Sequence, residues 1–154
     1  MPTEHTTDSP SPPILWLDNQ VCFALYSTSL AMTKLYKPLL DAIGLTYPQY
    51  LAMLVLWEGD GITVGDISAR LLTDPGSLTP LLKRLEAEGL LTRTRSSADE
   101  RVVELRLTEK GRSLQQQAER FPACILEASG QTLEQINALR DQIVALRDQL
   151  QKSL

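Results

Sequence analysis

The stretch TVGDISARLLTDPGSLTPLLKRLEAEGLLTRTRSSADERVVELRLTEK, residues 63–110, decides the fold of this chain. Thr63, followed three residues later by Asp66, is typical of a capping box that opens a short helix. Asp74 and Pro75 fit the N-cap and the first position of a second helix. The stretch therefore predicts two helices joined by a tight turn.

The second of these helices has two different faces. Leucines recur at the spacing of a half-buried helix, at Leu78, Leu81, Leu82 and Leu85. The opposite face carries small hydroxyls and cations, namely Ser77, Thr79, Lys83 and Arg84. Such side chains suit phosphate oxygens and base edges. Gly89 ends the helix.

A β-hairpin follows, because residues 91–95 and 101–107 alternate in the manner of strands, with a loop over 96–100 between them. Its four arginines are Arg93, Arg95, Arg101 and Arg106. Helix, turn, helix and hairpin together predict a winged helix-turn-helix, a fold that is mainly α with a small β-wing, and make DNA the leading partner. An alternative without DNA binding remains, in which the helices only pack against each other and the arginines only protect the edge of a small sheet from aggregation.

Charge and composition limit the function further. The chain has 154 residues, is 43% hydrophobic and carries a formal charge of −4. Residues 63–112 hold nine basic and eight acidic side chains, a balance of +1, so the remainder carries −5. DNA affinity must therefore come from a local patch. The longest apolar run, Tyr50 to Trp57, is eight residues, too short to span a membrane.

The ends of the chain predict its organisation. Residues 1–13 contain four prolines and predict a disordered tail without a secretion signal, which with only two cysteines suggests a cytoplasmic protein. Residues 14–154 then form one domain, with candidate dimerisation helices at about 18–43 and 109–152 around a winged helix-turn-helix at about 47–107. The first helix should start at the N-cap Asp18 and be interrupted by Pro38.

Three further helices complete the prediction. Thr46 and Gln49 open a core helix that runs through Trp57, and Thr108 caps a long helix that Pro122 bends. Thr132 and Gln135 open the last helix. Its apolar residues form a narrow seam, Ile136, Leu139, Ile143, Leu146 and Leu150. Such a seam favours pairing with the same helix of a second chain. A homodimer predicts a palindromic operator, since two recognition helices must enter successive major grooves.

The sequence contains only one histidine and two cysteines, residue types that often carry out catalysis or bind metals. The only histidine, His5, lies in the predicted tail, and two cysteines without a folded histidine do not complete a zinc site. We therefore expect no metal, no cofactor and no enzyme. Cys22 stands out, because it shares a helical stripe with four hydroxyl-bearing side chains: Tyr26, Ser29, Thr33 and Tyr36.

Cys22 and Tyr36 are 14 residues apart, about 21 Å along one helix, so they cannot touch within a chain. If the first helices of two chains pair antiparallel, Cys22 would approach the Tyr36 of the other chain, and Tyr47 could join it. Phenol hydroxyls and the helix N-terminus would favour the thiolate, whereas Asp18 would oppose it. A buried structural thiol beside tyrosines that only pack is the alternative.

The chain resembles the OhrR type, the organic-hydroperoxide-sensing repressors of the MarR family. The resemblance rests on LDNQVCFALYSTSLAMTKLYKPLL, LTYPQYLAMLVLWE, LTPLLKRLEAEGLL and DERVVELRLTEKG, which begin at residues 17, 45, 78 and 99. It implies a MarR-like homodimer in a bacterial cytoplasm. Cys22 would then be the peroxidatic cysteine, hydrogen-bonded by Tyr36 and Tyr47 of the partner chain, with Tyr26 as a further candidate.

The same resemblance assigns the DNA contacts and the second cysteine. Asp99 and Arg101 would be the wing pair, with the arginine in the minor groove and Arg95 beside it. The recognition helix would add Ser77, Thr79, Lys83 and Arg84. Cys124 would be the resolving cysteine that forms a disulfide with Cys22 of the other chain. The implied function is a repressor that leaves its operator when an organic hydroperoxide oxidises Cys22. Two rivals stay open: a MarR-type repressor that answers a small aromatic ligand, and a thiol peroxidase acting through Cys22.

Overall fold

The computed structural model describes residues 10–154. The prediction of a disordered tail over 1–13 therefore falls largely outside the described residues, as does His5. The chain divides into two compact units, one up to Leu35 and one over Tyr36–Leu154. Among the described helices, none is both long enough and apolar enough to cross a membrane.

The N-terminal unit contains two single turns of 3-10 helix, Pro13–Leu15 and Leu17–Asn19, and most of helix α1, Val21–Asp41, whose last residues belong to the second unit. The expected N-cap at Asp18 is wrong, because Asp18 lies inside the second turn and α1 begins three residues later. The expected interruption at Pro38 is wrong too. Pro38 lies within the last turn of α1, where a missing N–H costs only one hydrogen bond, and the helix continues so that Leu40 is buried.

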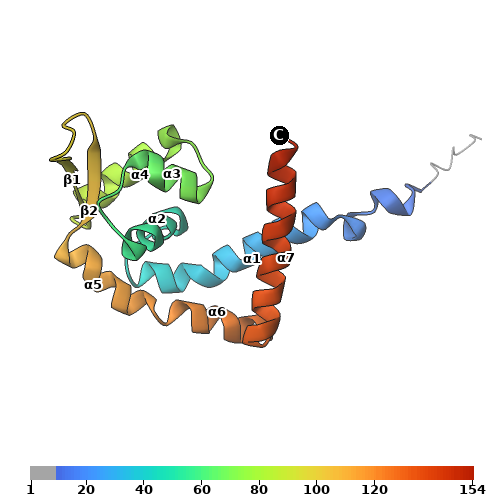
Figure 1. Cartoon of the computed structure of the whole chain (residues 1–154). Helices are drawn as coiled ribbons and strands as arrows, with labels where there is room; N and C mark the ends of the chain where they lie inside the picture. The colour runs from blue at the N-terminus through green and yellow to red at the C-terminus, as the bar shows by residue number, and fades with distance from the viewer. Residues whose placement is uncertain (1–9) are drawn as a thin grey trace, which may run out of the picture. The chain divides into compact units, whose positions relative to one another are not determined.

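The second unit contains helices α2 (Tyr47–Glu58), α3 (Val64–Leu71) and α4 (Pro75–Ala87), followed by strands β1 (Leu91–Arg95) and β2 (Val103–Leu107). Figure 1 shows these elements gathered around α2. The capping boxes expected at Thr46 and Thr63 are both present. Asp74 caps α4 through the backbone N–H of Ser77. The helix-turn-helix followed by a hairpin is confirmed.

The hairpin is antiparallel, with Leu91 opposite Leu107 and Arg95 opposite Val103. The second strand starts at Val103 and not at residue 101, because the N–H of Val102 closes a turn onto the carbonyl of Asp99 at 3.0 Å. A short segment before α3 also pairs with the hairpin, through a bridge between Ile62 and Leu105. The base of the wing is thereby tied to the helices.

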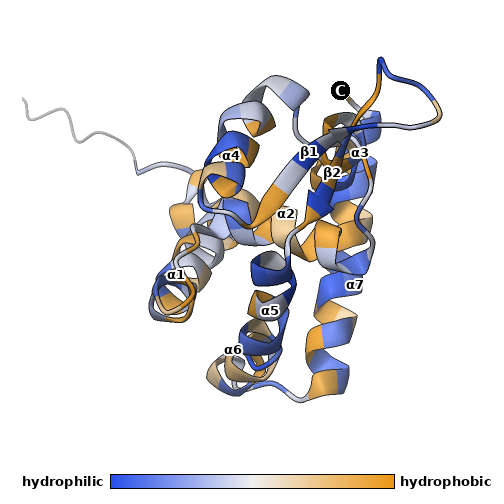
Figure 2. Ribbon diagram, turned by 90° about the vertical axis from the view of Figure 1, so that its left-hand side faces the viewer, coloured by the Kyte–Doolittle hydropathy of each residue, from blue (hydrophilic) through white to orange (hydrophobic). Residues whose placement is uncertain are grey.

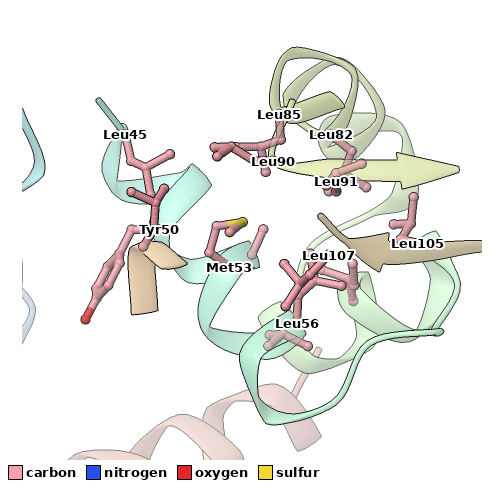
Figure 3. Packing of buried hydrophobic residues seen from close by; sticks show 14 of the residues in the cluster. Leu45, Tyr50, Met53, Leu56, Leu82, Leu85, Leu90, Leu91, Leu105 and Leu107 are labelled. Carbon is pink, nitrogen blue, oxygen red and sulfur yellow. The ribbon is translucent and has the colours of Figure 1, made fainter. Parts of the chain in front are cut away.

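The core lies between α2 and the helix-turn-helix with its hairpin. Figure 3 shows Met53 and Leu56 of α2 facing leucines of α4 and of both strands. Eight large side chains are less than 2% exposed: Phe121, Met53, Leu56, Ile67, Leu82, Leu85, Leu91 and Leu105. In Figure 2, α2 is coloured as mostly hydrophobic whereas α7 is banded. The burial of α2 predicted from its composition is confirmed.

The C-terminal part holds three helices, α5 (Glu109–Ala118), α6 (Phe121–Ser129) and α7 (Leu133–Lys152). The single bent helix expected from 108 to 130 is wrong, because the chain breaks into α5 and α6. Pro122 occupies the first turn of α6, a position where its missing N–H costs no hydrogen bond. The capping box of α7 at Thr132 is present as expected.

The start of α5 is fastened to the end of α4. The N–H of Thr108 donates to the carbonyl of Leu90 at 3.1 Å, and the Lys110 ammonium donates to the carbonyl of Glu88 at 2.9 Å. The indole N–H of Trp57 donates to the carbonyl of Gly111 at 2.9 Å. A β-carbon at Gly111 would lie 2.1 Å from the carbonyl oxygen of Leu90. Only glycine permits this close approach of two backbone segments.

A Gly111→Ala substitution should lower the free energy of unfolding by about 1–3 kcal/mol, the usual cost of an overpacked buried site. Thermal and urea unfolding monitored by circular dichroism measure this loss. Gly59→Ala is the matched control, because a β-carbon at Gly59 meets nothing within 4 Å. Equal stability of the two variants would contradict the close contact at Gly111.

Candidate nucleic-acid interface and thiol site

Helix α4 presents an exposed face on the side opposite its buried leucines. Lys83 and Arg84 lie on this face and are exposed, as the sequence predicts, together with Gly76 and Pro80. Leu78, Leu82 and Leu85 hold the other face in the core. The helix therefore offers two cations and two small, uncharged residues to a partner.

The two hydroxyl residues of the predicted recognition set are held by α4 itself. The Ser77 hydroxyl donates to the Asp74 carboxylate at 2.7 Å, and the Thr79 hydroxyl donates to the carbonyl of Pro75 at 3.0 Å. Ser77 is exposed, whereas Thr79 is only half-exposed. Both hydroxyls retain acceptor capacity but are already placed by the start of the helix.

Two exposed arginines lie near the tip of the wing, Arg95 at the end of β1 and Arg101 in the loop. Arg101 makes a bidentate contact with Asp99, Nε to Oδ1 at 3.1 Å and Nη2 to Oδ2 at 3.2 Å, while its side chain stays 90% exposed. These hydrogen bonds from Arg101 lower the pKa of Asp99, so the carboxylate stays ionised and holds the guanidinium in one orientation. Arg95 donates to the carbonyl of Glu100 at 2.7 Å.

The other two hairpin arginines are engaged at the base of the wing. Arg93 is mostly buried, with its Nε 3.6 Å from a carboxylate oxygen of Glu86 on α4. Arg106 pairs with Glu104 at 2.8 Å and lies against Gly61. Of the four hairpin arginines, only Arg93 is mostly buried. Arg106 is paired, but its side chain stays 51% exposed, and Arg95 and Arg101 are exposed as well.

Three tyrosines form a cluster in the second unit. The ring centroids of Tyr36 and Tyr47 lie 5.2 Å apart, and Tyr50 lies 5.8 Å from Tyr36 and 6.2 Å from Tyr47. The sequence paired Tyr36 with Tyr47 but placed Tyr50 only in the core. Tyr50 stands at i+3 from Tyr47 on one helix, and that spacing was the available signal. In Figure 3 its hydroxyl points away from the leucines of the core.

Burial raises the pKa of each of these phenols further above neutral pH. Burial, together with the neighbouring Tyr50 and Tyr47, raises the pKa of Tyr36 to about 12. Burial also raises the pKa of Tyr47 and of Tyr50. At neutral pH the cluster therefore consists of O–H groups that can donate hydrogen bonds to an anion.

The two cysteines are both free thiols, and they lie in different units. Cys22 is the second residue of α1 and is exposed, and Tyr26, one turn later, is also exposed. Cys124 lies on α6 and is half-buried. No group of three or more potential metal ligands occurs among residues 10–154.

A helix-turn-helix with a basic outer face, followed by an arginine-tipped hairpin, defines a winged-helix DNA-binding protein. Comparison with known proteins supports this class. Residues 34–118 match the family model for the transcriptional regulator SarA/Rot. The organic hydroperoxide resistance transcriptional regulator of Bacillus subtilis strain 168 is 50% identical over 127 residues, 82% of this chain and 86% of the relative. The HTH-type transcriptional regulator TtmR of Methylorubrum extorquens PA1 is 47% identical over 87% of this chain and 69% of its own length.

The solved structures agree. AbfR of Staphylococcus epidermidis is 33% identical, with a TM-score of 0.72 over 88% of this chain and 94% of AbfR. AbfR has been solved bound to DNA in a reduced form and in an overoxidized form, and separately with a disulfide formed. The chain belongs to the family of organic hydroperoxide resistance transcriptional regulators, the OhrR type of MarR-like winged-helix proteins.

Proposed function

We propose that this DNA-binding regulator is a repressor whose operator affinity is controlled by oxidation of Cys22. The observation that carries the proposal is the combination of an exposed thiol at the start of α1 with a cluster of protonated phenols at Tyr36 and Tyr47. A thiolate reacts with peroxides far faster than a thiol. Phenol donors stabilise the thiolate, and family membership supports organic hydroperoxides as the oxidant.

The phenols reach Cys22 only if a second chain supplies them, since α1 separates Cys22 from Tyr36 within one chain. Apolar side chains on both terminal helices support a homodimer. On α1, Val21, Leu30, Met32 and Leu35 are exposed, and on α7, Leu139, Ile143 and Leu150 are exposed. Exposed apolar rows of this kind are typical of protein interfaces. We infer that these faces are buried between two chains.

The redox step balances without a cofactor. The Cys22 thiolate attacks the terminal peroxide oxygen, the O–O bond breaks, and an alcohol leaves once the alkoxide takes up a proton. Cys22 becomes a sulfenic acid. The thiol of Cys124 from the other chain then attacks the Cys22 sulfur, forming a disulfide and releasing water.

A disulfide requires α-carbons within about 7 Å. Cys124 lies on α6 three residues after Phe121, whose side chain is fully buried. Movement of α6 toward the partner's Cys22 would therefore pull on the core and on α5, which is fastened to the end of α4 through Lys110 and to α2 through Trp57. The spacing of the two recognition helices changes, and the operator is released.

The test of this function is loss of operator binding when an organic hydroperoxide is added, with recovery on thiol reduction. A palindromic operator selected by the reduced protein from random DNA serves as the probe. Fluorescence anisotropy reports binding. Unchanged binding after complete oxidation of Cys22 contradicts the proposal.

The DNA interface predicts a separate result. Arg101→Ala should weaken operator binding by about 10-fold to 100-fold, as expected for a base-reading arginine, because the guanidinium held by Asp99 is lost. Arg140→Ala is the matched control, since Arg140 is also an exposed arginine paired with a nearby aspartate. Equal affinities for the two variants would remove the wing from the interface.

A small-ligand response is the second candidate. A cavity of about 350 Å³ lies between α2 and the α5–α6 region and is lined by Tyr50, Leu54, Trp57 and Pro122, a size that suits a small organic molecule. An aromatic compound that releases the operator while Cys22 stays reduced would favour this candidate over the redox switch.

A further inference from the structure

The exposed face of α4 contains two residues, Gly76 and Pro80, that lower the stability of the helix although packing within the chain does not require them. Gly76 and Pro80 are four residues apart on this face, and both are exposed. Glycine and proline are the two poorest helix formers. Pro80 stands at the sixth position of α4, where its missing N–H leaves the carbonyl of Gly76 without its helical donor.

The protein's own packing does not require either residue. A β-carbon at Gly76 would meet only a carboxylate oxygen of Asp74, at 3.8 Å, which is ordinary contact. The backbone of Gly76 is not among the positive-φ glycines. Pro80 is exposed and does not belong to the hydrophobic core. The cost of these residues to helix stability is therefore not offset within the chain.

Because of these two residues, few bulky side chains project from α4 on the side that would enter the major groove of DNA. Gly76, Pro80, Lys83 and Ala87 follow one another at steps of four, three and four along the exposed side. Lys83 is the only long side chain in this row. A helix whose outer face lacks bulk lies closer to the floor of the major groove, because nothing holds the backbone away.

Proline offers a ring of CH₂ groups and no hydrogen-bond donor. The one apolar feature on the floor of the major groove is the C5-methyl group of thymine. We propose that Pro80 determines sequence specificity by packing on a thymine methyl in each operator half-site, with Gly76 allowing the close approach. This inference rests on the proposed function as a DNA-binding repressor and does not depend on its redox switch.

The experiment uses the full-length, fully reduced protein and its selected operator. Each thymine is replaced in turn by uracil, which lacks only the methyl group. The wild type should lose about threefold to fivefold in affinity at one thymine per half-site, the effect of one buried methyl group. Pro80→Ala should bind the thymine and uracil operators equally at that position, while its melting temperature rises. Pro38→Ala, which changes another exposed proline inside a helix, is the control and should keep the wild-type preference.

Gly76→Ala tests the close approach. The added methyl group should raise the melting temperature, because alanine favours helix, and should lower the affinity for every operator sequence by about 10-fold or more. Retention of the thymine preference by Pro80→Ala, or wild-type affinity of Gly76→Ala, overturns the inference. Absence of any operator binding by the wild type would instead refute the proposed repressor.

Discussion

A Cys22→Ser variant should bind the operator as tightly as the reduced wild type does and should stay bound when an organic hydroperoxide is added. Serine replaces one sulfur by oxygen, and because Cys22 is exposed, the exchange disturbs no packing within the chain. The hydroxyl is not oxidised by peroxides, so the first step of the switch is lost. We expect at least a 10-fold loss of affinity for the oxidised wild type and less than a twofold change for the variant.

The measurement is a pair of anisotropy titrations of labelled operator, before and after treatment with cumene hydroperoxide. Iodoacetamide labelling of the reduced wild type confirms that Cys22 was available at the start. Release of the operator from Cys22→Ser under the same treatment would mean that another group senses the oxidant, and the assignment of Cys22 would be lost.

A Cys124→Ser variant should lose the covalent dimer completely while Cys22 is still oxidised. In the proposed switch the second thiol serves only to capture the sulfenic acid, so its removal should leave Cys22 open to further oxidation. Operator binding after oxidation should stay closer to that of the reduced protein, because the proposed movement of α6 requires the disulfide.

Non-reducing gels and intact-mass spectra distinguish the outcomes. The wild type should give a dimer band that thiol reductant removes, whereas Cys124→Ser should give monomers that carry added oxygen. Cys22→Ser is the control and should give neither. A covalent dimer of Cys124→Ser would show that the two Cys22 residues pair with each other, and would exclude Cys124 as the resolving cysteine.

Local chemistry made much of the fold predictable from sequence. Thr46, Thr63 and Thr132 cap their helices with side chains three residues away, so each signal lies within one helical turn. The leucines of α4 and the alternation of β1 are equally local. These features suffice to predict a winged helix-turn-helix.

The errors arose where distant segments decide the structure. Pro38 was expected to interrupt α1, but burial of Leu40 in the core extends the helix past it. The bridge between Ile62 and Leu105 joins residues 43 positions apart, and the requirement for glycine at 111 comes from the carbonyl of Leu90. No periodicity in the sequence reports such contacts.

In the candidate site, too, some residues could be placed from the sequence, whereas others are placed by contacts between distant segments. Lys83 was predicted from the spacing of its helix, whereas Arg95 and Arg101 were singled out by the family resemblance. All three are exposed in the structure. Arg93 has the same residue type in the same strand as Arg95, yet it is drawn to Glu86 on α4. Tyr50 joins the tyrosine cluster because the start of α2 meets the end of α1, a contact that depends on the folded core.

The most direct test of the central claim follows the thiol and the DNA in one sample. Reduced wild-type protein on labelled operator receives one equivalent of an organic hydroperoxide per chain; anisotropy is recorded, and quenched aliquots are analysed by intact mass. We expect Cys22 to be oxidised first and the operator to be released as the Cys22–Cys124 disulfide forms. Release from protein whose Cys22 is still a free thiol would contradict this expectation.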